Sequence, residues 1–182
     1  MSIDDEIKAA LASGQLHILE LKMPSDLAAR TVLIHPELKR LLDGPWKNDG
    51  EMRRIGRLQA DLEAFVTGKV ISMCLTPYNH RTAYMGLLDP PTKGIFDIRS
   101  RDPSPGMRVF GGFVMPDVFV ALNYEFRSIS PDWSDRRPLQ ADPIRWALAT
   151  LECESRWEQI FSSPPITGGN VRDFITTDAV SI

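Results

Sequence analysis

Two stretches of the chain carry apolar residues every three or four positions, which is the spacing of a helix that buries one face. In the first stretch, from Glu51 to Thr67, the stripe consists of Met52, Ile55, Leu58, Leu62 and Phe65. In the second, from Asp142 to Phe161, it consists of Trp146, Thr150, Cys153, Trp157 and Ile160. Gly68 is a typical helix end, and Asp142 followed by Pro143 is a typical helix start. We therefore expect two long helices, at 51–67 and 142–161.

Between these helices the pattern changes to alternation, which is the period of a strand with two unlike faces. It covers 94–101, 107–115 and 118–127, separated by the loop 102–106 and a turn at Pro116-Asp117. A run rich in β-formers at 70–75 indicates a further strand. In the last alternating stretch the apolar positions are Val118, Val120, Leu122, Tyr124 and Phe126. The short connections predict an antiparallel meander with one apolar face and one polar face that bears arginines.

Together these elements predict an α+β fold in a single domain, residues 1–182. We expect a curved antiparallel sheet of about four strands, packed on its apolar face by both helices. Residues 1–50 are expected to form an added helical and strand segment, 51–127 the core, and 141–182 the C-terminal helix and tail. One hydrophobic core is predicted to contain Leu62, Phe65, Phe96, Ile98, Val118, Val120, Leu122, Trp146 and Trp157.

The composition is that of an ordinary globular protein. The 182 residues are 43% hydrophobic and 25% charged, which excludes a mostly disordered or fibrous chain. The net charge of −3 argues against a strongly basic protein that coats nucleic acid and against a polybasic membrane binder, but it leaves room for a local basic site. An acidic N-terminus and the lack of an apolar run of ~20 residues predict a cytoplasmic protein with no membrane partner.

The cysteines and histidines predict neither a disulfide framework nor a metal site. Cys74 and Cys153 lie 79 positions apart and no CxxC motif is present, so we expect two buried, free thiols. His17, His35 and His80 have no metal-ligand spacing with one another or with carboxylates. No fingerprint of a nucleotide-binding loop is present either. We therefore expect no metal and no cofactor.

Three short motifs follow one another in the middle of the chain: GIFDIRSR at 94–101, MRVF at 107–110 and DVFVAL at 117–122. This series, after a helix and a strand, resembles the core of the RelE/ParE superfamily, including HigB-like toxins, over residues 51–127. The resemblance implies a RelE/ParE-like core, RNA binding, an endoribonuclease activity that needs no metal, and an antitoxin-like protein partner. The chain departs from the family in its extra residues on both sides of this region and in having only Lys69 and Lys93 within it.

Arginines on the predicted strands are the candidates for binding a phosphate group. Arg99 and Arg101 lie two positions apart and so share a face of one strand. Arg108 lies in the next strand, and Arg127 ends the third. Guanidinium groups bind phosphate through paired hydrogen bonds, and fixed cations stabilise the charge that develops when an RNA 2′-hydroxyl attacks its phosphate. The resemblance gives Arg99 and Arg108 catalytic roles, with Arg101 and Arg127 binding the substrate.

Cleavage also requires a group that accepts and donates a proton. His80, in the polar loop 78–81, is one candidate because its ordinary pKa suits the task. Tyr124 is the second candidate and Glu125 the third. Arg81, beside His80, is a further candidate for binding the substrate.

Two alternatives use the same residues. In the first, Asp97 and Glu125 pair the arginines across a solvated sheet face, and the protein is a non-catalytic module that binds another protein. In the second, it is a small-molecule enzyme that uses His80 and the arginines. A concave, arginine-lined face within reach of His80 would favour the RNA hypothesis, whereas arginines that are all paired to acids would favour the binding module.

Overall fold

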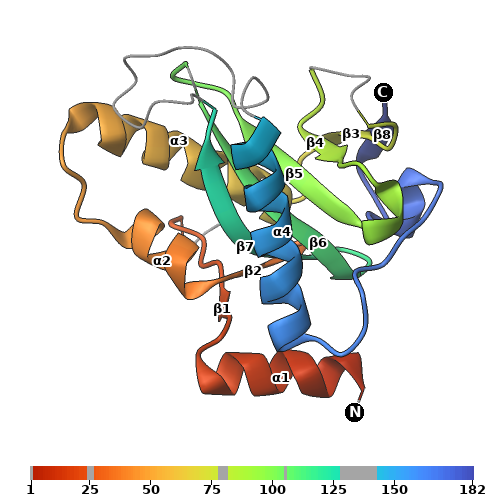
Figure 1. Ribbon diagram of the computed structural model, residues 1–182. Helices are drawn as coiled ribbons and strands as arrows, with labels where there is room; N and C mark the ends of the chain where they lie inside the picture. The colour runs from red at the N-terminus through yellow and green to blue at the C-terminus, as the bar shows by residue number, and fades with distance from the viewer. Residues whose placement is uncertain (1, 24–26, 78–81, 105, 128–142) are drawn as a thin grey trace.

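The computed structural model describes residues 2–23, 27–77, 82–104, 106–127 and 143–182 (Figure 1). The strands in this part of the chain form an eight-stranded sheet in the order β1-β2-β7-β6-β5-β4-β3-β8. Their bounds are β1 (His17–Ile18), β2 (Thr31–Ile34), β3 (Ile71–Cys74), β4 (Met85–Leu87), β5 (Ile95–Ser100), β6 (Met107–Met115), β7 (Val118–Phe126) and β8 (Ala179–Ser181). The pairs from β4 to β7 are antiparallel, whereas β2 runs parallel to β7, and β3 runs parallel to both β4 and β8.

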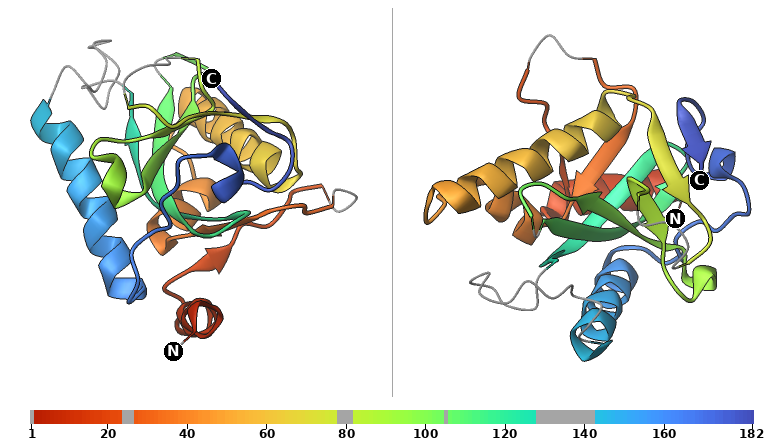
Figure 2. Two further views of the ribbon diagram at one scale, coloured as in Figure 1. Left: turned by 90° about the vertical axis from the view of Figure 1, so that its right-hand side faces the viewer. Right: turned by 90° about the horizontal axis from the view of Figure 1, so that it is seen from above.

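Helices cover both faces of this sheet (Figure 2). On one face lie α2 (Pro36–Asp43) and α3 (Asp49–Val66), and on the other lies α4 (Pro143–Ile160), with α1 (Ile3–Ser13) near its C-terminal end. Short 3-10 turns are η1 (Pro91–Lys93) and η3 (Val171–Asp173). The α3 and α4 bounds confirm the two predicted helices to within two residues at each end. The three alternating stretches are confirmed as β5, β6 and β7.

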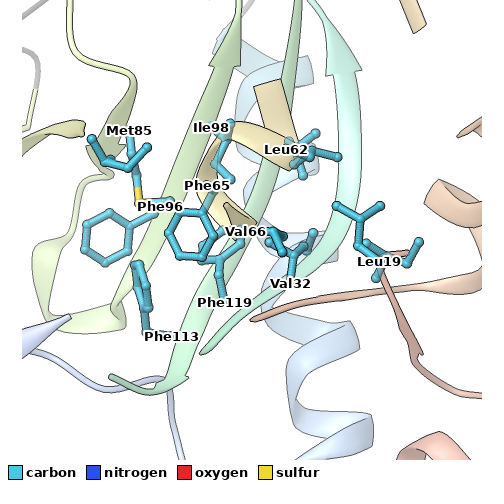
Figure 3. Close-up of a cluster of buried hydrophobic side chains, with 14 of the residues drawn as sticks. Leu19, Val32, Leu62, Phe65, Val66, Met85, Phe96, Ile98, Phe113 and Phe119 are labelled. Atoms are coloured by element: carbon cyan, nitrogen blue, oxygen red, sulfur yellow. The ribbon is translucent and has the colours of Figure 1, made fainter. Parts of the chain in front are cut away.

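Each face of the sheet has its own hydrophobic core. The core under α3 is rich in phenylalanine (Figure 3), with the Phe65 ring 6.1 Å from Phe113 and 6.3 Å from Phe119. The core under α4 contains Leu33, Ile95, Phe110, Val120, Leu122, Cys153 and Trp157. The sheet is therefore buried on both sides, as a mixed sheet between helical layers must be.

The predicted fold class is wrong: the protein is an α/β structure with an eight-stranded mixed sheet, not a curved antiparallel sheet of four strands. The strands that prediction missed are β2, β4 and β8, which have three or four residues each, whereas β1 lies in the segment expected to add a strand. Runs this short show no measurable alternation, and the parallel pairing of β2 with β7 joins segments that are distant in the sequence. Residues 1–50 thus supply two strands of the sheet.

The prediction of a single core is also wrong. Leu62, Phe65, Phe96 and Ile98 belong to the core under α3, whereas Val120, Leu122 and Trp157 belong to the core under α4. Trp146 and Val118 pack against the second core. The predicted set mixed residues of both faces because the sheet has no solvated face to contrast with the buried one.

A β-bulge in β7 changes which residues share a face. Phe110 pairs with Asn123 and Gly111 with Ala121, which leaves Leu122 as an extra residue in β7. Leu122 packs in the core under α4, and the next residue, Asn123, also points to α4, where its Nδ2 donates to the Ala149 carbonyl at 2.9 Å. The alternation is therefore inverted beyond Leu122. The apolar series from Val118 to Phe126 does not lie on one face.

Cys74 and Cys153 are buried free thiols, as predicted. Burial raises the pKa of the Cys153 thiol. Among the described residues, no helix is both long enough and apolar enough to cross a membrane.

Candidate anion-binding site

The register of three strands brings two of the predicted arginines and a glutamate into one row. Arg99 of β5 pairs with Arg108 of β6, and Arg108 pairs with Glu125 of β7. Their side chains lie on the α4 face of the sheet, as do Ile95, four positions before Arg99, and Phe110, two positions after Arg108. The row lies on the same face as Asn123, which binds α4 directly.

Asp97 is the centre of this group of side chains. Its carboxylate is fully buried and accepts hydrogen bonds from Arg99 Nε at 3.0 and 3.2 Å and a short one from Arg108 Nη1. Arg108 is also buried, with 6% of its surface exposed. A buried carboxylate must be paired with a cation, and here one carboxylate is shared by two guanidinium groups.

Arg101 extends the group beyond the end of β5. Its Nη1 donates to the Thr82 carbonyl at 2.9 Å and its Nη2 to the Ala83 carbonyl at 2.6 Å. These contacts hold the guanidinium beside the segment that leads into β4. Burial lowers the pKa of Arg101, and the neighbouring Arg99 lowers it further.

Arg127 completes the group from the end of β7. Its backbone N–H donates to the Gly106 carbonyl at 3.0 Å. Among the described residues, its guanidinium forms no hydrogen bond or ion pair. Partial burial, followed by the charges of Arg108 and Arg101, lowers the pKa of Arg127 to about 10, against a normal value near 12.5. We call Arg99, Arg101, Arg108 and Arg127, gathered around Asp97, the arginine site.

The first turn of α4 contributes two residues that contact the row of side chains, Arg145 and Trp146. Arg145 Nη2 donates to Glu125 Oε2 at 2.6 Å, so this carboxylate pairs with the helix. The guanidinium of Arg108 lies 5.1 Å from the centre of the Trp146 ring, which packs edge-on against Phe110. A cation over an indole face is stabilised by the ring electrons, so Trp146 helps to retain a cation at a buried position.

The structure brings together four of the seven predicted site residues: Arg99, Arg101, Arg108 and Arg127. It places Tyr124 on the opposite face, because of the bulge at Leu122. There Tyr124 lines a pocket of about 270 Å³ with Trp46 and Glu37, and burial raises its pKa. Tyr124 thus does not meet the arginines across the sheet, and the predicted role beside Arg108 is corrected. His80 and Arg81 lie outside the described residues.

Sequence reasoning missed three contributors to this site and misjudged the burial of a fourth. Gly86 of β4 pairs with Asp97 and leaves room for the Arg99 side chain, and nothing in its local sequence marks it. Trp146 was assigned to the helix core alone, and Arg145 was not considered. Asp97 was expected only as a partner in a solvated face, whereas it is fully buried.

Among the described residues, no three His, Cys, Asp or Glu side chains meet in a way that could hold a metal ion. The chain matches no protein-family model, no curated protein and no solved structure. Its function is therefore inferred from the chemistry of the arginine site.

Proposed function

We propose that the protein binds RNA and that the arginine site receives a phosphate group of the RNA backbone. The gathering of four guanidinium groups around Asp97 carries this proposal. Four guanidinium groups surround one buried carboxylate, and the other acid in the row, Glu125, is paired with Arg145. Guanidinium groups gathered on one face of a sheet present several N–H donors that match the oxygens of an anion.

Mutual repulsion among the arginines supports the same conclusion. Burial lowers the pKa of Arg127 most, Arg108, Arg101 and Arg99 lower it further, and among the described residues Asp97 opposes them. An added phosphate would place negative charge beside Arg127 and so oppose the repulsion from the other arginines. Guanidinium groups suit this ligand because their planar N–H pairs match two phosphate oxygens. The resemblance of residues 51–127 to RelE/ParE proteins is the reason to choose RNA among phosphate-bearing ligands.

Cleavage of the RNA is a separate step of this proposal. The arginine site could stabilise negative charge on a phosphate under attack, but it contains no described group suited to accept a proton. Asp97 and Glu125 are both engaged with arginines. His80 is the proposed proton acceptor, from the sequence alone.

The alternative of a non-catalytic binding module keeps some support. Arg99 and Arg108 both contact Asp97, and Arg101 contacts backbone carbonyls, as expected for arginines with a structural role. The two hypotheses differ in the role that they give to Arg127. Among the described residues, no acidic side chain forms an ion pair with its guanidinium. Arg127 is therefore the residue on which the experiment should act.

The test is RNA binding measured by fluorescence anisotropy over a range of salt concentrations. Binding through phosphates weakens as salt rises, and each phosphate contact on a single strand contributes about 0.7 to the log–log slope. Arg127→Gln should weaken binding and reduce the slope by about that amount. Arg127→Lys should retain the slope because it keeps the charge.

Arg53→Gln is the matched control. Arg53 is an exposed arginine of α3, which packs on the opposite face of the sheet, so its loss changes the net charge equally but leaves the site intact. An equal effect of both variants would mean that binding follows net charge and not this site. No RNA binding at low salt would refute the proposal and favour the binding module.

A further inference from the structure

The outer face of α4 carries a row of exposed aliphatic side chains. Ile144, Leu148 and Leu151 expose 73%, 60% and 58% of their surfaces. The inner face of the same helix buries Ala149, Cys153, Trp157 and, at its end, Phe161. Figure 2 shows α4 at the edge of the molecule. We call these three residues the α4 stripe.

The spacing of the α4 stripe is that of a two-helix interface. Its members are four and then three residues apart, the a and d spacing of helices that pack side by side. The next position in this series is Ser155, which is polar, so the α4 stripe ends after three residues. Large aliphatic residues aligned on one exposed face, rather than scattered, indicate a surface that another molecule covers.

Charges beside the stripe indicate which molecule that is. Arg145 and Glu152 are seven residues apart and therefore lie on the same flank of the helix. When two copies of one helix pair antiparallel, this flank faces itself, so each Arg145 meets the Glu152 of the other copy. In a parallel pair, Glu152 would instead face Ala147. The helix is thus complementary to an antiparallel second copy of itself.

Both charged side chains can make this contact while they keep their present partners. Arg145 already donates to Glu125, and Glu152 accepts from Arg156 and, at 3.5 Å, from Asn123 Nδ2. A carboxylate has about four acceptor positions and a guanidinium has five N–H groups, so each can take a further partner. The side chain of Glu152 is 50% exposed and that of Arg145 is 24% exposed.

We infer that two copies of the protein associate through an antiparallel, twofold pairing of their α4 helices. The register that joins Arg145 to Glu152 of the second copy also sets Leu148 against Leu151 of that copy, and Ile144 against Ser155. Such an interface is the same patch on both copies and closes on itself. With three aliphatic side chains per copy it is smaller than a standard interface, so the dimer forms only at high protein concentration.

The first test is sedimentation velocity from about 5 to about 500 µM protein, a range that covers weak association. The average mass should rise from that of the 20.5 kDa chain toward twice that value. Leu148→Glu should weaken association about 100-fold or more, because the interface would bury two unpaired carboxylates. Val70→Glu is the matched control, since Val70 is 66% exposed but lies before β3. A chain that stays monomeric throughout would overturn the inference.

The second test is disulfide trapping, which reports the direction of the helices. Leu148→Cys and Leu151→Cys proteins are mixed and oxidised; Cys74 and Cys153 are buried and should not compete. The antiparallel register predicts that the mixed 148–151 disulfide forms faster than either same-position disulfide. Faster joining of position 148 to itself would indicate a parallel pair and overturn the register. Equal rates for all three would indicate random collision and refute the interface.

Discussion

The guanidinium of Arg99 lies against Gly86 of the neighbouring strand, so closely that a Cβ atom at position 86 would stand 2.9 Å from Arg99 Cζ and 3.1 Å from Asp97 Oδ1. Gly86 therefore keeps space for the Arg99 side chain in the arginine site, although glycine has no side-chain group that could bind a ligand. Because the obstructing atoms are the far end of a flexible side chain, a methyl group should displace Arg99 without disrupting β4.

Gly86→Ala should therefore loosen the Arg99–Asp97 pair. We expect the free energy of unfolding to fall by about 1–2 kcal/mol, the range for one weakened buried hydrogen bond, and RNA affinity to fall with it. Urea denaturation and anisotropy are the two measurements. Gly56→Ala is the control, because Gly56 lies exposed in α3 with open space around it and should gain about 0.5–1 kcal/mol. Unchanged stability and binding in Gly86→Ala would show that Arg99 has no fixed place in the site.

Asp97→Asn should be more damaging, because it removes the carboxylate from between the buried Arg108 and the partly buried Arg99. Breaking a buried ion pair by neutralising one partner typically costs about 3–5 kcal/mol. The double variant Asp97→Asn/Arg108→Gln should recover part of that loss, since the second change removes an uncompensated charge. Urea denaturation of the wild type, both single variants and the double variant gives the coupling energy. Strictly additive losses would contradict the pairing of Asp97 with Arg108.

The stability of the protein should decrease in mildly acidic solution because of His35. Its Nδ1 accepts from the Glu37 backbone N–H at 3.3 Å and lies 3.1 Å from Arg156 Nη1, while Arg40 and Glu152 are also near. Burial and then Arg156 lower the pKa of His35, with Glu37 opposing them. A lowered folded-state pKa means that the fold favours neutral His35. This contribution is complete above the unfolded value, near 6.5, and is lost as the pH falls through the folded pKa.

Unfolding free energy measured at several pH values between about 7 and about 5 should therefore decline. His35→Asn should flatten that part of the profile, because an asparagine can accept the same N-terminal hydrogen bond of α2 without titrating. The same decline in the variant would assign the effect to another group.

RNA cleavage, if the arginine site acts on its ligand, should depend on His80. A positioned general acid or base contributes about 10²–10⁴-fold, so His80→Ala should lose that factor while RNA affinity stays unchanged. DNA of the same sequence should bind without being cut, because the 2′-hydroxyl is absent. His17→Ala is the control, since His17 lies in β1 at the far edge of the sheet. Equal cleavage rates in His80→Ala and wild type would remove His80 from the mechanism.

The long elements of this fold could be predicted because each contains several periods of its pattern. The α3 helix repeats its apolar stripe over 18 residues, and β5 to β7 alternate over six to nine. Arg99, Arg101 and Arg108 cluster because they lie on two strands that are consecutive in the chain and pair with each other. Their proximity could therefore be predicted from the sequence. The order of the eight strands was not, because β2 and β8 find their partners by contacts across the whole chain.

The position of Tyr124 could not be predicted for a different reason. The series through Val120, Leu122 and Tyr124 alternates perfectly in sequence, yet the unpaired Leu122 inverts the faces beyond it. A bulge cannot be recognised from the sequence when the residues after it continue the alternation of apolar and polar positions. Likewise, the need for a glycine at position 86 can be recognised only when the position of the side chain that lies against it is known.

The bulge at Leu122 decides which face every later residue of β7 occupies. If β7 kept all its residues but paired with β6 without the bulge, Glu125 and Arg127 would lie on the face of α3 and Tyr124 on the face of α4. No amino acid would be changed, yet Arg127 and the partner of Arg145 would be on the wrong side of the sheet. Deletion of Leu122 would remove the bulge and still leave Asn123 and every later residue on its present face, so redesign of this strand must either keep the bulge or remove Leu122 with it.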